Sequence, residues 1–382
     1  MEPIIEDRPY LLLTPGPLTT TRSVKEAMLV DLSTWDQDYN NIVQQVRSRI
    51  VQLATSTNAY TSVLVQGSGT FAVEATIGSV VPAEGRLLVV SNGAYGKRIS
   101  LIAARLNIPF VEMICSETAC PDPQRLDQIL SMDSSITHVA MVHCETTTGI
   151  LNPIRELGQI VKRYDRVLIL DAMSSFGGIP FMVDEIGADY LISSANKCVQ
   201  GVPGFGFVIC HRETFEKTRG YARSLSLDLY DQWQTMEAYN GKWRYTSPTH
   251  TLLAFHQALE ELADEGGIQA RYQRYSACQK ALVQGMRSLG FAPLLDDDFH
   301  SPIITAFFFP QEAWFDFSIF YQLLKQRLFV IYPGKVSDHD TFRIGTIGDL
   351  NLDDIDRLIG AVQETVLVMK GDPQQNSAIF VI

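Results

Sequence analysis

Short apolar runs alternate with helical patterns from about residue 60 to residue 210. The runs are rich in β-branched residues, and several of them are apolar at nearly every position. A strand has this composition when helices cover both faces of its sheet, as in parallel sheets. The pattern therefore predicts an α/β domain whose strands are joined by crossover helices. The runs cover residues 61–66, 86–90, 136–143, 166–171, 189–194 and 204–210.

The rhythm of the chain changes after residue 210. A long helical pattern over residues 249–265 is followed by Gly266 and Gly267, a typical helix ending, and we expect this helix to link two domains. The remainder alternates helices and strands on a smaller scale, which predicts a second, smaller α+β unit. Its expected helices cover 269–289, 317–327 and the residues from 352 onward, and its expected strands cover 303–309, 329–332 and 341–345.

The charge balance restricts the kinds of partner. The 382 residues include 31 basic and 43 acidic side chains, which gives a formal net charge of −12. The electrostatic field of this negative charge repels nucleic acid and anionic membranes, so we expect neither as a partner. An anionic ligand would need cations and N–H groups close to its binding site. The six cysteines form no C-x-x-C pair, and the chain has no basic leader or long apolar stretch. These features predict reduced thiols, no membrane span and a cytoplasmic protein.

A glycine-rich segment, Gln66-Gly67-Ser68-Gly69-Thr70, directly follows the first strand and opens a helix. Its N–H groups and hydroxyls suit a phosphate, because the N-terminus of a helix carries partial positive charge. An ordinary helix N-cap by Ser68 explains the same residues equally well. The sequence contains neither the Walker A pattern nor the fingerprint G-x-G-x-x-G, which disfavours a nucleotidase and a dinucleotide-dependent enzyme.

Two charged residues end or follow later strands of the pattern. Asp171 ends an apolar run at the sheet edge where open α/β proteins bind ligands, and a buried carboxylate there needs a cation or N–H donors. Lys197 follows the next strand among small residues, a setting that lowers the pKa of a lysine and lets it attack carbonyl groups. Taken singly, Asp171 is explained as a loop cap and Lys197 as a solvated lysine. Together with residues 66–70 they match the three anchors of pyridoxal 5′-phosphate: its ring nitrogen, its aldehyde and its phosphate.

The chain resembles the class V aminotransferases of fold type I in motifs that run through nearly its whole length. These motifs are LLLTPGPL (11–18), VKEAM (24–28), QGSG (66–69), VSNGAYG (90–96), AMVHCETTTG (140–149), DAMSSFGGIP (171–180), SSANKCVQGVPGFGFVI (193–209), SLSLDLY (224–230), KWRYTSPTHT (242–251), LLDDDFHSPIITAF (294–307), VIYPGK (330–335) and FRIG (342–345). The resemblance implies the α/β fold of pyridoxal-phosphate-dependent transferases. A large domain (18–265) would hold a mostly parallel seven-stranded sheet, and residues 1–17 and 266–382 would form a small α+β domain.

The resemblance also assigns roles to single residues. Lys197 would bind the cofactor covalently and move a proton between substrate and cofactor, and Asp171 would pair with the ring nitrogen. The other cofactor-binding residues would be Ser68, Gly69, Thr70 and Asn196 at the phosphate, Tyr95 on the ring face, Thr146 at the ring hydroxyl, and Thr246 at the phosphate of a neighbouring subunit. Arg343 would bind the acidic end of the substrate, with the backbone at Gly16 and the weaker candidate Arg22 beside it. The site shared through Thr246 implies a homodimer.

The later motifs resemble one subfamily, which implies that the amino group moves from 2-aminoethylphosphonate to pyruvate, giving phosphonoacetaldehyde and L-alanine. Transamination between alanine and glyoxylate, or between serine and pyruvate, is the alternative, because it needs the same cofactor-binding residues. A cysteine desulfurase is disfavoured because no cysteine follows Cys278, and Lys197 argues against a non-catalytic cofactor-binding protein. The seven histidines show no metal-ligand spacing, so His143 is expected to be a core or pocket-wall residue and no metal is predicted.

Overall fold

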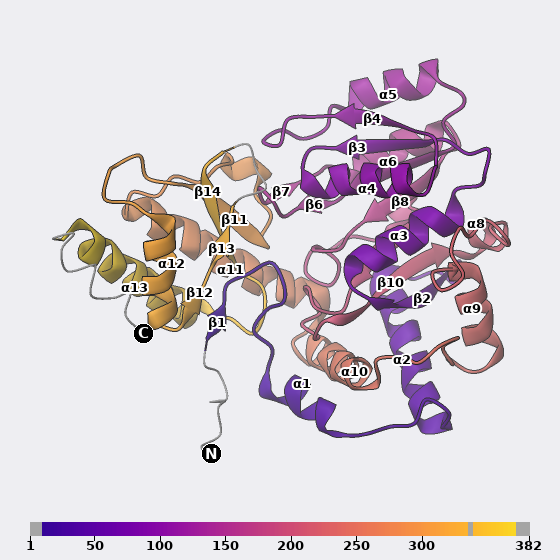
Figure 1. Ribbon diagram of the computed structural model, residues 1–382, viewed down its shortest axis with the longest axis horizontal. Helices are drawn as coiled ribbons and strands as arrows, with labels where there is room; N and C mark the ends of the chain where they lie inside the picture. The colour runs from indigo at the N-terminus through magenta and orange to yellow at the C-terminus, as the bar shows by residue number, and fades with distance from the viewer. Residues whose placement is uncertain (1–9, 335–338, 372–382) are drawn as a thin grey trace.

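The computed structural model describes residues 10–334 and 339–371, which form a larger and a smaller part (Figure 1). The strands are β1 (Leu11–Leu12), β2 (Tyr60–Gly67), β3 (Leu87–Ser91), β4 (Phe110–Ile114), β5 (His138–Val142), β6 (Cys144–Glu145), β7 (Ile150–Leu151), β8 (Val167–Asp171), β9 (Tyr190–Ser194), β10 (Gly204–His211), β11 (Ile304–Phe308), β12 (Phe329–Val330), β13 (Tyr332–Pro333) and β14 (Thr341–Gly345). The helices are α1 (Arg22–Glu26), η1 (Ala27–Leu29), α2 (Gln37–Ala54), α3 (Gly69–Val80), α4 (Ala94–Arg105), α5 (Pro123–Met132), α6 (Ile154–Arg163), α7 (Val183–Ile186), α8 (Arg212–Glu216), α9 (Leu229–Ala238), α10 (Thr249–Asp264), α11 (Gly267–Ser288), η2 (Asp297–Phe299), α12 (Phe317–Gln326) and α13 (Leu352–Lys370).

Seven strands form the central sheet, in the order β2-β10-β9-β8-β5-β3-β4. Neighbouring strands from β9 to β4 are parallel, while β10 is antiparallel to both β2 and β9. The predicted α/β fold with a mostly parallel seven-stranded sheet is therefore confirmed. Because every strand except β10 runs in one direction, the carboxyl ends of these strands meet at one edge, which is where ligands bind in open α/β sheets.

Two strands of the central sheet differ from what the apolar runs predict. β4 is not among the predicted runs, because it is an edge strand whose Glu112 and Ile114 are exposed and whose sequence is therefore less apolar. β10 follows β9 without an intervening helix. Two parallel strands need a crossover connection between them, usually a helix, so β10 runs antiparallel to β9.

Helices cover the central sheet on both faces (Figure 1). α3 packs against β2, β9 and β10, α4 packs against β3, β4 and β5, and α6 packs against β8. β5 is buried at every position, and β8 at every position except its first, as the apolar runs predict. The predicted linking helix is α10, which leads through Gly266, in the left-handed conformation with φ +103°, directly into α11.

The smaller part contains a three-stranded antiparallel sheet in the order β11-β14-β13. α11 and α12 pack against α13. The predicted strand over 329–332 is divided into β12 and β13, because β12 pairs with β1 whereas β13 pairs with β14. The pairing of β1 with β12 places the N-terminal segment against the smaller part.

The hydrophobic core has two main clusters. One contains buried residues from Val24 to Leu259, and the other joins Leu11 and Leu13 to residues from Cys278 to Met369. Two separate cores support the division of the chain into a large domain, 18–265, and a small domain, 1–17 with 266–382. That division stays a prediction.

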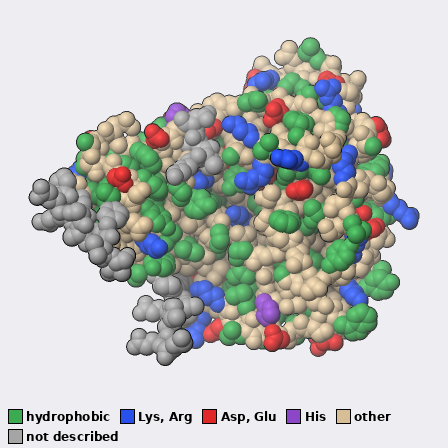
Figure 2. Space-filling model, in the orientation of Figure 1, with side chains coloured by type: hydrophobic (Ala, Val, Ile, Leu, Met, Phe, Trp, Pro, Cys, Tyr) green, Lys and Arg blue, Asp and Glu red, His purple; other side chains and the backbone are tan. Residues whose placement is uncertain are grey.

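Charges of both signs are interspersed over the face of the molecule in Figure 2. All six cysteines are free thiols. Within the described ranges, no helix combines the length and the apolar character that spanning a membrane requires.

Candidate active site

Five loops or strand ends that carry predicted site residues lie at the carboxyl edge of the central sheet. Residues 66–70 span the end of β2 and the start of α3, and Tyr95 follows β3 in the first turn of α4. Thr146 follows β5 and the short β6, Asp171 ends β8, and Lys197 follows β9. The fold therefore gathers side chains that are far apart in the sequence, as binding at this edge requires.

Lys197 lies half-buried in the turn after β9. Its Nζ donates hydrogen bonds to the carbonyl oxygens of Pro15 and Gly16, each at 3.2 Å. The N-terminal segment thus reaches the lysine, while the predicted role of Gly16 in closing the substrate pocket stays a prediction. Burial lowers the pKa of Lys197 to about 8, against the raising effect of the negative charge on Asp171. An amine with this pKa is partly neutral near pH 7 and is able to act as a nucleophile or a base.

Asp171 is 4% exposed, so its carboxylate is almost fully buried. Oδ1 accepts a hydrogen bond from the backbone N–H of Met173 at 2.9 Å, while Oδ2 accepts none from the described residues. Burial raises the pKa of Asp171 to about 6, opposed by the N–H of Met173 and the positive charges of Arg98 and Lys197. A cation placed at Oδ2 would reduce the cost of burying this charge.

The segment 66–70 presents unused donors at the start of α3. Ser68 occupies the N-cap position, but its side chain makes no capping hydrogen bond, so the hydroxyl does not serve as an ordinary N-cap. The N–H groups of Gly69 and Thr70 lie in the first turn, where a helix supplies no acceptor. The hydroxyl of Thr70 accepts a hydrogen bond from Nη1 of Arg98 at 3.3 Å. The segment itself has no charged side chain, and Arg98 is the cation beside it.

Arg343 joins the smaller part to the turn that carries Thr146. The Arg343 side chain is buried on β14, and its Nη1 donates to the carbonyl oxygen of Thr146 at 2.9 Å. Nε and Nη2 donate to the carbonyl of Pro333 at 3.1 and 2.7 Å, and the guanidinium lies 4.8 Å from the ring centre of Tyr332. No carboxylate of the described residues pairs with this guanidinium. Its charge therefore suits an anionic ligand, which a guanidinium binds with two parallel hydrogen bonds.

The remaining predicted site residues make fewer contacts with Lys197, Asp171, Arg343 and the segment 66–70. Asn196 precedes Lys197, and its Oδ1 accepts a hydrogen bond from the hydroxyl of Ser194 at 3.1 Å. Thr246 is exposed, and no hydrogen bond between described residues joins it to residues 66–70 of its own chain. Arg22 is also exposed and pairs with Glu26 at 2.6 Å, and the described contacts do not link it to Lys197 or Arg343. The roles of these residues stay predictions.

Two charged residues near the site were not anticipated from the sequence. Arg98 lies one helical turn after Tyr95, with its guanidinium 4.8 Å from the centre of the Tyr95 ring. Glu145 is fully buried, and its carboxylate accepts hydrogen bonds from the backbone of Tyr95 and from Thr147. The sequence could have pointed to Glu145 through its position inside the motif at 140–149. A carboxylate at the end of so apolar a strand needs hydrogen-bond donors nearby.

The donor set fits pyridoxal 5′-phosphate. Oδ2 of Asp171 is free to accept a hydrogen bond from a protonated ring nitrogen. The first turn of α3 and the hydroxyl of Ser68 have donors to spare for a phosphate. Among the described residues, the amine of Lys197 donates hydrogen bonds to two carbonyl oxygens and to no other group, which leaves its lone pair available to an aldehyde when the amine is neutral.

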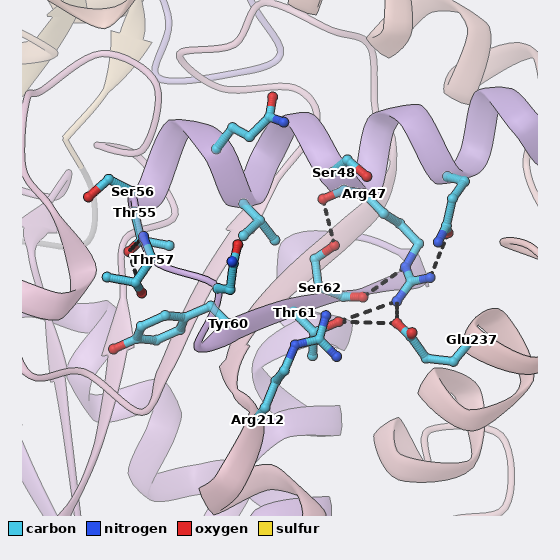
Figure 3. A pocket seen from close by; sticks show the side chains of 14 residues that line it. Arg47, Ser48, Thr55, Ser56, Thr57, Tyr60, Thr61, Ser62, Arg212 and Glu237 are labelled. Atoms are coloured by element: carbon cyan, nitrogen blue, oxygen red, sulfur yellow. Dashed lines mark hydrogen bonds and ion pairs between the residues drawn. The ribbon is translucent and has the colours of Figure 1, made fainter.

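A separate polar pocket lies elsewhere on the large part (Figure 3). Tyr60 at the beginning of β2 lines it, whereas the segment 66–70 lies at the other end of the same strand. Within this pocket, Arg47 pairs with Glu237 at 2.6 Å and donates to the carbonyl of Ser62 at 3.0 Å. The pocket contains none of the predicted site residues, and the charge of its buried arginine is already balanced.

Relatives of the chain are found among known proteins and among solved structures. The 2-aminoethylphosphonate–pyruvate transaminase of Vibrio vulnificus (strain YJ016) is 60% identical over 358 residues, which cover 94% of this chain and 98% of that protein. The transaminase of the same name from Salmonella paratyphi C (strain RKS4594) is 58% identical over 357 residues, or 93% and 97% of the two chains. The crystal structure of pyridoxamine–pyruvate aminotransferase from Mesorhizobium loti has a TM-score of 0.86 and 22% identity, covering 97% of each chain. That structure shows the same fold.

The sequence model of the aminotransferase class-V family matches residues 23–327. This match spans the central sheet, the segment 66–70, Asp171 and Lys197. The chain therefore belongs to the class-V aminotransferases.

Proposed function

We propose that this chain is a pyridoxal-phosphate-dependent transaminase that transfers the amino group of 2-aminoethylphosphonate to pyruvate, giving phosphonoacetaldehyde and L-alanine. The observation that carries the proposal is the 60% identity, over 94% of the chain, to a protein named for this reaction. The alternative donors, alanine and serine, are not favoured. A solved structure named alanine–glyoxylate aminotransferase is only 22% identical and shows the fold alone.

Lys197 and Asp171 are the proposed catalytic residues. Bound pyridoxal phosphate supplies an electron-withdrawing ring that accepts the electron pair left behind when a proton leaves the amino-bearing carbon. Nζ of Lys197 takes that proton, because an amine with a pKa of about 8 is a competent base near neutral pH. Oδ2 of Asp171 holds the ring nitrogen in its protonated form. Tyr95 would hold the ring by its face, and Thr146 would bind the ring hydroxyl.

The phosphate of the cofactor is assigned to Ser68, Gly69 and Thr70, with Asn196 beside them. The unused first-turn N–H groups of α3 support this assignment. Arg343 is assigned to the phosphonate of the amino donor and to the carboxylate of pyruvate, with the backbone of Gly16 closing the pocket. The cytoplasmic location also stays a prediction, and the six free thiols support a reducing compartment.

An alanine-forming assay tests the proposed function directly. Purified protein loaded with cofactor is expected to convert 2-aminoethylphosphonate and pyruvate to alanine and phosphonoacetaldehyde. Reactions with alanine plus glyoxylate and with serine plus pyruvate serve as comparisons. Faster turnover of either comparison pair would contradict the choice of the phosphonate.

Replacing Arg343 with lysine tests the assignment of the substrate anion. Lysine keeps the positive charge but loses the planar fork, so binding of both substrates should weaken by ~1–3 kcal/mol, the scale of a charge-assisted hydrogen bond. Steady-state kinetics of the two half-reactions measure this effect.

The matched control is Arg223→Lys. Arg223 also donates to backbone carbonyls, those of Gly78, Val81 and Pro82, but it does so near the C-terminal end of α3, away from the segment 66–70. If Arg343→Lys and Arg343→Ala both kept the wild-type kinetic constants for the phosphonate and for pyruvate, Arg343 would not be a substrate-binding residue.

The active unit is proposed to be a homodimer in which Thr246 reaches the cofactor phosphate of the neighbouring subunit. An apolar cleft beside the phosphate segment supports a second copy at this surface, because exposed apolar side chains gather there. Gly67, Trp243 and Tyr245 line the cleft together with Phe71, and Phe71 and Tyr245 are each about half exposed.

Dilution is expected to reduce cofactor retention and activity together, because a shared site couples cofactor affinity to association. Sedimentation at assay concentration, combined with the absorbance of the bound cofactor, measures both quantities. Thr246→Val should weaken cofactor binding without dissociating the dimer. A fully active monomer would refute the shared site.

A further inference from the structure

Glu145 is a buried carboxylate with no role in the function proposed above. It ends β6, is fully buried, and begins the turn 145–149 that carries Thr146. Its backbone carbonyl closes that turn by accepting hydrogen bonds from the N–H groups of Thr148 and Gly149, at 3.3 and 2.9 Å. The side chain is therefore fixed to a defined piece of backbone.

The carboxylate of Glu145 bridges two walls of the site. Oε2 accepts the backbone N–H of Tyr95 at 3.1 Å, and Oε1 accepts the hydroxyl and the N–H of Thr147 at 2.8 and 3.4 Å. The N–H of Gly96 also faces the carboxylate. Glu145 thus binds the first turn of α4 and its own turn at once.

The local sequence accommodates this bridge. α4 has no side-chain N-cap of its own, so Glu145 supplies the acceptor that a capping residue ordinarily provides. The partial positive charge at the start of α4 favours an anion there. A Cβ atom at position 93 would clash with the carboxylate, so Gly93 leaves the space that Glu145 fills.

The connection extends into the smaller part. The residue next to Glu145 is Thr146, whose carbonyl oxygen accepts the hydrogen bond from Arg343. One buried carboxylate therefore lies between the ring-stacking residue Tyr95, the ring-hydroxyl residue Thr146 and the substrate-binding residue Arg343. Burial raises the pKa of Glu145 to about 7, and its hydrogen bonds from Thr147, Tyr95 and Gly96 oppose that rise.

We propose that Glu145 is a positioning residue for the transamination proposed above, and that it acts by fixing the first turn of α4, and with it the Tyr95 ring, against the turn that carries Thr146. The described partners of its carboxylate are the backbone N–H groups of Tyr95, Gly96 and Thr147 and the hydroxyl of Thr147. A glutamine would lose the charge and one acceptor oxygen, so its amide would face the N–H of Tyr95 or that of Thr147, and only the Thr147 hydroxyl could turn to accept from it. A small displacement of Tyr95 and Thr146 would tilt the cofactor ring, and displacements of this size are costly for catalysis.

The test compares Glu145→Gln with wild type in the holoenzyme. The expected results are a fall in kcat of about 10-fold or more and a weaker visible circular dichroism of the bound cofactor, which reports how the ring is held. Far-ultraviolet circular dichroism should not change. Wild-type kcat together with wild-type cofactor dichroism in this variant would overturn the proposal.

A double-mutant cycle tests the route through Tyr95. If Glu145 acts by holding the Tyr95 ring, adding Glu145→Gln to Tyr95→Ala should change the cofactor dichroism much less than adding it to wild type. Strictly additive effects would overturn this route. Thr147→Val, which removes one donor and keeps the carboxylate, should produce the same changes on a smaller scale, and it keeps the test decisive if Glu145→Gln does not fold.

Asp189→Asn provides the matched control. Asp189 is also a buried carboxylate that joins separate elements, since it accepts hydrogen bonds from Leu168 N–H, Lys162 and Thr214, but it precedes β9 at the opposite edge of the sheet. Its replacement should lower thermal stability and leave the cofactor dichroism unchanged. The same loss of dichroism in Asp189→Asn would overturn a specific role for Glu145. Because the dichroism needs no turnover, a failure of the proposed reaction remains distinguishable from a failure of this inference.

Discussion

Alanine formation is expected to fall to background when Lys197 is replaced by alanine. The side chain at this position supplies both the amine that binds the cofactor covalently and the base that moves the proton. Nζ lies beside the carbonyls of Pro15 and Gly16, and its pKa of about 8 allows both tasks near neutral pH. Purified wild-type protein is expected to be yellow, because a cofactor attached to a lysine absorbs visible light, and absorbance spectra with alanine assays measure both effects.

The Lys197→Ala variant should still bind the cofactor without the covalent bond, since Asp171 and the segment 66–70 remain. Lys217→Ala is the matched control, because Lys217 is an exposed lysine paired with Glu213 on the surface. Its activity should equal that of wild type. Normal turnover by Lys197→Ala would refute the assignment of this lysine and with it the proposed mechanism.

The rate of the chemical step is expected to fall by at least ~10²-fold in Asp171→Ala, the usual effect of removing one electrostatic stabiliser. The carboxylate would keep the ring nitrogen protonated, and its negative charge would favour removal of the substrate proton more than it favours substrate binding. The pKa of Asp171, about 6 through burial, would drop further with a cation at Oδ2, so the group would stay ionised at neutral pH.

Single-turnover kinetics with 2-aminoethylphosphonate measure that step apart from product release. Asp171→Asn is the closer variant, because its side-chain oxygen can still accept the N–H of Met173 while the charge is lost. Both variants should keep the fold. A change confined to the Michaelis constant of the substrate would show that Asp171 does not act at the ring nitrogen.

Local sequence patterns predict much of the proposed site. Residues 66–70, Asp171 and Lys197 each end or follow an apolar run, and strands that run in parallel bring their carboxyl ends to one edge. Membership of the class-V aminotransferases, shown by the match over residues 23–327, agrees with the motifs. The strand at 110–114 escaped detection because it lies at the sheet edge, where the pattern is only partly apolar.

The sequence alone determined the alternation of strands and helices, the α/β class and the positions where chemistry gathers, because each depends on residues close together in the chain. The tertiary structure decided what depends on packing between distant segments. It paired β10 antiparallel with β2, brought Pro15 and Gly16 to Lys197, and joined Arg343 to Thr146. It also placed the carboxylate of Glu145 against Tyr95, a contact between residues 50 positions apart that exists only because β3 and β5 are neighbours in one sheet.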